Sequence, residues 1–139
     1  MFLMDSRLQQ DTCVLGDFPL CRLLLSKDAN YPWFILVPRR EAVSELFDLS
    51  QEDQAQFWKE TTYLAEVLKR EFSADKMNVA TLGNVVSQMH MHVIVRHQQD
   101  AAWPAPVWGK LPAIEYAPGQ VDAIRQRLRG LLEHDYEEA

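Results

Sequence analysis

The sequence has few cysteines and an excess of negative charge, and both features restrict its possible roles. Cys13 and Cys21 are its two cysteines and lack the spacing of a zinc knuckle, so neither a disulfide framework nor a zinc finger is expected. The formal net charge is -6, and a negative surface repels nucleic acids and anionic lipids. We therefore expect a protein of a reducing compartment whose partners include no nucleic-acid polymer and no membrane.

Long hydrophobic runs are also missing. No segment approaches the roughly 20 apolar residues that span a bilayer. Residues 1–4 are followed at once by Asp5 and Arg7, so the basic region and apolar core of a signal peptide are absent. These absences predict a cytoplasmic protein. The 139 residues, 47% of them hydrophobic, suit a single globular domain over 1–139.

The first half of the chain predicts a hairpin, a buried strand and a helix. Residues 13–15 and 20–25 are mostly apolar and flank Gly16 to Pro19, which is typical of two strands joined by a turn. Residues 33–37 form an apolar run that Pro38 ends. Ser50 to Asp53 resembles a capping box, and apolar residues recur at helical spacing as far as Phe72.

The second half predicts two further strands and a terminal helix. Residues 77–82 and 88–96 have strand character and are separated by Gly83-Asn84. Residues 101–118 hold too many prolines for regular structure, and residues 121–132 have helical periodicity. The expected fold is therefore α+β, with an antiparallel five-stranded sheet, one long helix and a C-terminal helix.

The segment 88–96 carries the most informative pattern, because polar and apolar residues alternate along it. Side chains alternate faces on a strand, so the apolar residues would face a core. The other face then presents five side chains in a row: Gln88, His90, His92, Ile94 and Arg96. Two of the four histidines of the chain share this face.

Three interpretations of this face remain open. It is a solvated outer surface, a phosphate site or a metal site. The polar loop 83–87 precedes it, and the backbone N–H groups of such a loop can cradle an anion. His90 and His92 could instead chelate zinc, but a third ligand is not evident, since His97 points to the opposite face and His134 is remote in sequence.

The run Gln88-Met-His90-Met-His92-Val-Ile resembles the signature of the histidine triad (HIT) family, in which three histidines alternate with hydrophobic residues. Residues 28–32 and 34–40 are similar to the family's strand that ends in a proline and two basic residues, and Asn78 followed by Gly83 resembles its approach to the signature. The resemblance covers about residues 10–110. The tryptophan- and proline-rich loop and last helix, residues 101–134, are less diagnostic.

The resemblance implies a mechanism. His90 corresponds to the family's nucleophile, which attacks the α-phosphorus of a nucleotide conjugate and forms a covalent nucleotidyl-histidine. The main-chain carbonyl of Gln88 would hold the other nitrogen of His90 as a donor, and His92 would contact the phosphate and help to protonate the leaving group. Phosphate oxygens would be bound by the loop before the signature, through Gly83, Asn84, Val86 and Ser87.

The sequence departs from the family pattern at several positions, among them Asn84, where many members have a glutamine. Gln88 replaces the first histidine of the triad, and Trp33 stands where the family has an additional histidine. Because a backbone carbonyl orients the nucleophile, we expect the site to persist. The candidates for further nucleotide contacts are Asp28 for the ribose, with Asn30 close behind it, and Asn78.

The resemblance therefore predicts a nucleotide hydrolase or nucleotidyl transferase that needs no metal and no cofactor. Its substrate would be a dinucleoside polyphosphate or a nucleoside phosphoramidate, and it would form a homodimer. The alternatives are a nucleotide-binding module with weakened turnover and a metal-dependent hydrolase that uses His90 and His92 as ligands.

Five other side chains have more than one interpretation. Arg39 and Arg40 are expected to be solvated, with phosphate binding as the alternative, and Arg96 is either a surface residue or an outer phosphate contact. Packing is the expected use of the indole rings of Trp103 and Trp108, with base stacking or a dimer interface as alternatives.

Overall fold

The computed structural model describes residues 1–132 and 135–139. Its elements follow the chain in this order: α1 (Ser6–Asp11), β1 (Thr12–Asp17), β2 (Cys21–Ser26), β3 (Trp33–Pro38), the 3-10 helix η1 (Leu46–Asp48), α2 (Gln51–Glu71), β4 (Lys76–Ala80), β5 (Met91–Arg96), α3 (Gln120–Arg129) and β6 (Glu137–Glu138). The expected range 101–134 therefore contains α3, while residues 133–134 lie outside the described residues.

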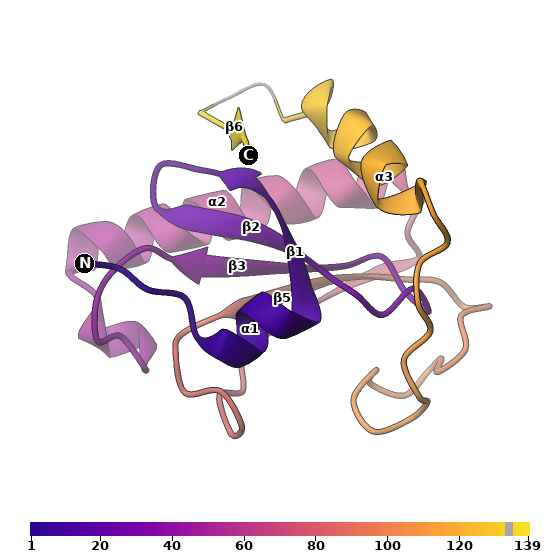
Figure 1. Ribbon diagram of the computed structural model, residues 1–139, viewed down its shortest axis with the longest axis horizontal. Coiled ribbons are helices and arrows are strands. Elements are labelled where there is room, and N and C mark those ends of the chain that lie inside the picture. Colours follow the sequence, from indigo (N-terminus) through magenta and orange to yellow (C-terminus); the bar gives the residue numbers. More distant parts are fainter. Residues whose placement is uncertain (133–134) are drawn as a thin grey trace.

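The sheet has the order β4-β5-β3-β2-β1-β6, and each neighbouring pair is antiparallel (Figure 1). The α+β class with an antiparallel sheet is confirmed. The expected number of five strands is wrong, because the two-residue β6 pairs with the end of β1. A Cβ at Gly16 would lie 2.5 Å from the Tyr136 hydroxyl and from the Glu137 carbonyl oxygen, so glycine permits this close approach.

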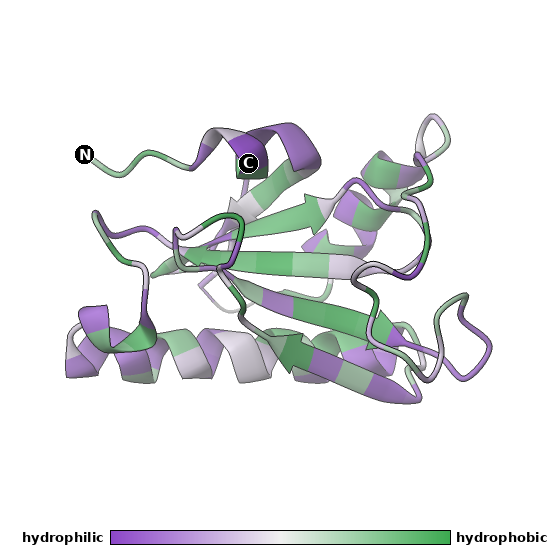
Figure 2. Cartoon of the chain, turned by 90° about the horizontal axis from the view of Figure 1, so that it is seen from below, coloured by the Kyte–Doolittle hydropathy of each residue, from purple (hydrophilic) through white to green (hydrophobic). Residues whose placement is uncertain are grey.

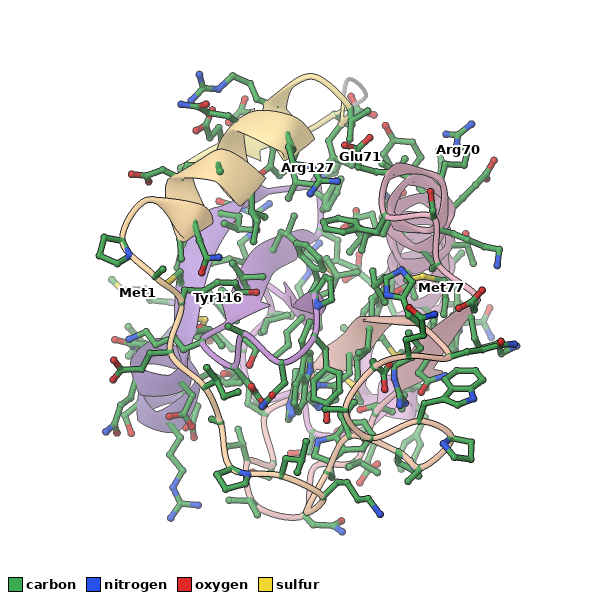
Figure 3. All side chains as sticks on the ribbon, turned by 90° about the vertical axis from the view of Figure 1, so that its right-hand side faces the viewer. Met1, Arg70, Glu71, Met77, Tyr116 and Arg127 are labelled. Carbon is green, nitrogen blue, oxygen red and sulfur yellow. The ribbon has the colours of Figure 1, made fainter. Side chains whose placement is uncertain are left out.

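The two faces of the sheet are covered by different parts of the chain. The main core lies between the sheet and the helices α2 and α3, which contribute residues such as Phe57, Leu64 and Leu128. Figure 3 shows Arg127 of α3 beside Glu71 at the end of α2, and the two side chains form an ion pair of 3.0 Å. The opposite face is covered by residues 1–11 and by the long loop before α3 (Figure 1).

The sequence accounts for these layers. The strands are largely hydrophobic, whereas α2 mixes polar and apolar residues around its circumference (Figure 2). The side chain of Ser50 accepts a hydrogen bond from the Asp53 N–H, which is the N-cap contact that the sequence predicts. Burial of the apolar stripe of α2 then supplies most of the stability of this helix.

The strand that carries the histidines is shorter than expected. β5 begins at Met91 rather than at Gln88, because the main-chain groups before it bond outside the ladder. The Met89 N–H donates to the Val43 carbonyl, and the Gln88 carbonyl lies 2.7 Å from a ring nitrogen of His90. The expected alternation of faces nevertheless continues, since Met89 lies in the main core with Met91, Val93 and Val95.

Candidate functional site

A cavity of about 300 Å³ lies on the face of the sheet opposite α2. Its walls come from α1, from strands β3 and β5, from the loop between β4 and β5, and from the long loop before α3. They consist of Arg7, Leu8, Asp11, Thr12, Ser26, Trp33, Ile35, Leu82, Gly83, Asn84, Val85, Val86, His90, His92 and Trp108. Both histidines of the signature therefore line the same cavity.

His90 is held in a single orientation by main-chain oxygen atoms. Its Nδ1 lies 2.7 Å from the carbonyl oxygen of Gln88, which is the contact that the family resemblance implies. Because a carbonyl oxygen can only accept, Nδ1 carries a proton, so Nε2 keeps its lone pair in the neutral ring. The Thr81 hydroxyl donates to the His90 carbonyl at 2.7 Å, which fixes the backbone as well. Among the described residues, none forms a hydrogen bond with Nε2 of His90.

His92 has the opposite protonation pattern. The indole N–H of Trp33 donates to His92 Nδ1 at 2.9 Å. An indole nitrogen cannot accept, so Nδ1 is unprotonated and the proton of the neutral ring is on Nε2. Burial of the ring and, secondly, its proximity to His90 lower the pKa of His92 to about 3. His92 is therefore neutral near pH 7 and keeps one N–H donor.

The solvated interpretation of this face is wrong. His90 is 7% exposed and His92 is 6% exposed, since α1 and the long loop before α3 cover the outer face of β5. The ring centroids of the two histidines lie 4.9 Å apart with the planes at 76°. This arrangement places one unprotonated and one protonated Nε2 in the same buried region, which suits a nucleophile beside a hydrogen-bond donor.

Only the backbone of Gln88 makes the contact with His90 that was expected of this residue. Its side chain accepts from the Asp5 N–H at 2.8 Å and donates to the Leu3 carbonyl at 2.9 Å. The amide thus clamps the N-terminal segment and is absent from the walls of the histidine cavity. The predicted row of an amide and two imidazoles is therefore interrupted, because the Gln88 amide is hydrogen-bonded to the backbone of Leu3 and Asp5.

The expected phosphate loop is only partly at the cavity. Gly83, Asn84 and Val86 line it, and Gly83 has the left-handed φ of 81° that glycine adopts without strain. Ser87 lines a different depression, together with Gln88 and residues 42–44. The structure therefore brings three of the four proposed phosphate-binding residues to the histidines.

The predicted nucleotide-binding residues are more scattered. Asp28 lines a second groove that shares Trp33 and Trp108 with the histidine cavity. Asn30 donates to the Asp28 carboxylate at 2.8 Å and to the Pro112 carbonyl at 3.0 Å, so it stabilises the groove without lining it. Asn78 lines neither space.

Asn78 instead belongs to a cluster around Arg96. Arg96 was expected to be either a surface residue or an outer phosphate contact, and both expectations are wrong. Arg96 is 1% exposed and donates to Asp100, Asn78 and the Ala105 carbonyl. Its guanidinium also lies over the rings of Tyr31 and Trp103. Burial opposes the ionisation of Asp100, but the hydrogen bonds from Arg96 and from backbone N–H groups lower its pKa overall. The cluster anchors the long loop that bounds the site.

Two other arginines are also occupied elsewhere. Arg39 donates to the carbonyls of Phe18 and Pro19, and Arg40 forms a bidentate pair with Asp53. Neither lines the histidine cavity.

Trp108 does line the histidine cavity and meets His92 edge-on, with ring centroids 4.9 Å apart. Trp103 packs over Arg96 instead.

Sequence reasoning missed the wall formed by α1. Arg7, Leu8, Asp11 and the following Thr12 line the cavity, although no role was predicted for this segment. One signal was present: Asp5 is a good N-cap residue, and its side chain accepts from the Arg7 N–H. A six-residue helix is too short for a detectable apolar period.

The part of the chain that the structure describes contains no group of three or more His, Cys, Asp or Glu side chains placed to hold a metal ion. The Nε2 of His97 lies 2.9 Å from the Phe72 carbonyl, and His134 lies outside the described residues.

Within residues 1–132 and 135–139, no helix is long and apolar enough to cross a membrane.

Comparisons with known proteins point to one family. A model of the HIT domain matches residues 7–99. The chain is 45% identical to a histidine triad protein from Marinobacter aquaeolei, with a TM-score of 0.94 over 97% of this chain and 98% of that one. It is 43% identical to a histidine triad protein from Bradyrhizobium japonicum, with a TM-score of 0.92 over 94% and 97%. No protein of curated function matches the sequence.

A more distant structure shares the fold alone. It is a hypothetical histidine triad nucleotide-binding protein from Sulfolobus tokodaii, which is 16% identical to this chain. Its TM-score is 0.64, over 85% of this chain and 84% of that one.

Proposed function

The chain belongs to the HIT domain family, and from this premise we propose that it is a nucleotide hydrolase or nucleotidyl transferase acting through a covalent nucleotidyl-histidine on His90. The observation that carries the proposal is the buried His90 ring, whose Nδ1 is bonded to the Gln88 carbonyl while Nε2 remains unbonded within the described residues. A residue that only bound nucleotide would not require such a nucleophilic nitrogen.

In the first step, Nε2 of His90 attacks the α-phosphorus in line with the bond to the leaving group. The new N–P bond forms as the bond to the leaving group breaks, and the leaving group departs with that electron pair. The positive charge that develops on the ring is shared with Nδ1, whose N–H already donates to the Gln88 carbonyl at 2.7 Å. This contact stabilises the intermediate without a reorganisation of the protein.

In the second step, water or another acceptor attacks the same phosphorus and releases His90. The charge on the phosphoryl oxygens must be balanced in both steps. The cavity offers the N–H on Nε2 of His92 and polar groups of the loop that contains Gly83, Asn84 and Val86. Donors already in place in a buried site stabilise developing negative charge more strongly than water does.

The groove beside the histidine cavity is a suitable place for the rest of the nucleotide. It holds the Asp28 carboxylate, which we assign to a ribose hydroxyl, and the apolar side chains of Val107, Leu111 and Ile114. The Asn30 amide fixes the Asp28 carboxylate by donating to its Oδ1. The shared walls, Trp33 and Trp108, connect this groove to the site of the chemistry.

We also propose that two copies form a homodimer by pairing their β4 strands. β4 is the last strand of the sheet on its side. An open strand edge offers unpaired backbone groups to a second chain. Val79 of β4 and the nearby Leu82 and Val85 are exposed to 42%, 54% and 74%. Apolar residues beside an open edge favour burial against a partner.

The activity is tested with purified wild type and His90→Ala, each incubated with an adenosine phosphoramidate and with a dinucleoside polyphosphate. We expect the variant to lose turnover by roughly a thousandfold or more, the scale for loss of a nucleophile, while calorimetry shows nearly unchanged affinity for adenosine monophosphate. Hydrolysis that is unaffected by the substitution would remove His90 from the mechanism. Nucleotide binding without turnover in the wild type would instead identify a binding module.

A further inference from the structure

Trp33 stands where the HIT family has a histidine, and its indole N–H is a hydrogen-bond donor beside His92. Ile35 of β3 lies opposite His92 of β5, and Trp33 is two residues before Ile35 on the same face. Trp33 is therefore the diagonal cross-strand neighbour of His92, close enough for a large side chain to reach. The 2.9 Å bond from the indole nitrogen to Nδ1 uses this register.

An indole nitrogen differs from an imidazole nitrogen because it can only donate. A histidine partner would adapt to either tautomer of His92 by exchanging donor and acceptor roles, but a tryptophan accepts one tautomer alone. If His92 became an imidazolium, its Nδ1–H would point at the Trp33 N–H and the bond would be lost. Both ring contacts and burial keep His92 in place, since the rings of His90 and Trp108 each lie 4.9 Å away.

The charged groups near His92 would not stabilise an imidazolium that had lost the hydrogen bond to Trp33. The titratable or charged residues that line the cavity with His92 are His90, Arg7 and Asp11. In the described part of the chain, no carboxylate forms a hydrogen bond or an ion pair with the ring of His92. An imidazolium at this position would thus be buried without a paired anion, which is unfavourable.

We propose that Trp33 is a positioning residue that fixes His92 as a neutral ring with its proton on Nε2. His92 then remains a hydrogen-bond donor throughout the reaction and never serves as an imidazolium acid. The consequence for catalysis rests on the proposed function: His92 stabilises the phosphoryl oxygens, and the proton that a departing amine needs comes from the solvent or from the substrate. This differs from the expectation that His92 protonates the leaving group.

The state of His92 is measured directly by nitrogen-15 NMR of the imidazole rings in the free protein, so the result does not depend on any activity. In the wild type we expect a protonated Nε2, an unprotonated Nδ1 and no titration of His92 between about pH 5 and 8. A proton on Nδ1, or titration within this range, would overturn the proposal even if no variant folds.

Three variants separate the hydrogen bond from packing. Trp33→Phe keeps an aromatic ring but removes the donor, so His92 should gain a mixture of tautomers and begin to titrate. Trp33→His supplies a ring nitrogen that can donate or accept, so both tautomers of His92 should again be present and the ring should titrate. Trp108→Phe alters an edge contact of His92 that involves no hydrogen bond and should leave the wild-type spectrum. An unchanged tautomer and unchanged titration in folded Trp33→Phe would contradict the role of Trp33.

Discussion

His90 and His92 lie side by side, with ring centroids 4.9 Å apart, yet their Nδ1 atoms have opposite roles. Nδ1 of His90 donates to the Gln88 carbonyl, whereas Nδ1 of His92 accepts from the Trp33 indole. Consequently, Nε2 of neutral His90 has a free lone pair, whereas Nε2 of His92 carries the N–H donor. Two copies of the same side chain, one just before β5 and one on it, thus have different chemistry, and the difference comes entirely from the partners of Nδ1.

The buried neutral state of His92 predicts a stability that decreases in acid. Its pKa is about 3 in the folded chain, against a normal value of 6.5, so the unfolded chain binds an extra proton between these values. The free energy of unfolding should therefore fall as the pH drops below 6.5, by about 2 kcal/mol from this residue between pH 7 and 5. Urea denaturation at both pH values measures the change.

The matched control is His92→Gln, since a glutamine oxygen can accept the Trp33 N–H but does not titrate. The variant should lose the part of the pH dependence that His92 supplies and keep the contribution of all other groups. An identical pH dependence in wild type and variant would show that His92 is not the buried titrating group.

The Arg96 cluster predicts a large difference between two arginine substitutions. Arg96→Lys would lose the bidentate bond to the buried Asp100 and leave Asn78 and Ala105 without their donor. We expect the free energy of unfolding to decrease by about 2–3 kcal/mol. Arg40→Lys is the control, because Arg40 forms a similar pair with Asp53 at the surface, and it should cost less than about 1 kcal/mol. Equal effects in thermal or urea denaturation would contradict the structural role of Arg96.

The side chain of Gln88 predicts an effect on the N-terminal segment rather than on chemistry. Gln88→Ala removes both bonds to Leu3 and Asp5 but keeps the main-chain carbonyl that orients His90. Hydrogen exchange at the Asp5 amide should accelerate, while kcat stays within about a factor of ten. In Gln88→Glu the acceptor for Asp5 remains and the donor to Leu3 is lost, so the effect on exchange should be intermediate. A fall in kcat comparable with that of His90→Ala would show that the amide acts on the substrate.

The exposed β4 edge predicts that a charge there disrupts the homodimer. Val79→Lys should shift the mass in light scattering from two copies toward one, because a lysine on an open strand edge opposes pairing. Phe47→Ser is the control, since Phe47 is 78% exposed on η1 and outside the β4 strand. A dimer that persists in Val79→Lys would place the interface elsewhere.

The sequence predicted those features that depend on local periodicity. The long helix α2 and the alternation around His90 have a repeat of 3.6 or two residues in the printed sequence, and the hairpin and the buried strand before Pro38 are marked by short apolar runs bounded by Gly and Pro. The contact between His90 and the Gln88 carbonyl was also expected, because the resemblance to the HIT signature implies it.

The features that were not predicted depend on contacts between distant residues. α1 and β6 are short and polar, and each is held by a partner far along the chain: Gln88 binds the segment before α1, and Gly16 admits β6. The burial of Arg96 likewise depends on Asp100 and on the loop around it. The donor role of Trp33 follows from the pairing of β3 with β5, which no local pattern specifies.

The most direct test of covalent catalysis is the intact mass of the protein during turnover. Wild type, His90→Ala and the control His97→Ala are mixed with an adenosine phosphoramidate and stopped in alkaline denaturant, which preserves the acid-labile N–P bond. We predict an added nucleotidyl mass in wild type and His97→Ala that disappears after acid treatment and is absent from His90→Ala. The same adduct in His90→Ala, or product formation by wild type with no adduct in single-turnover samples, would contradict the account.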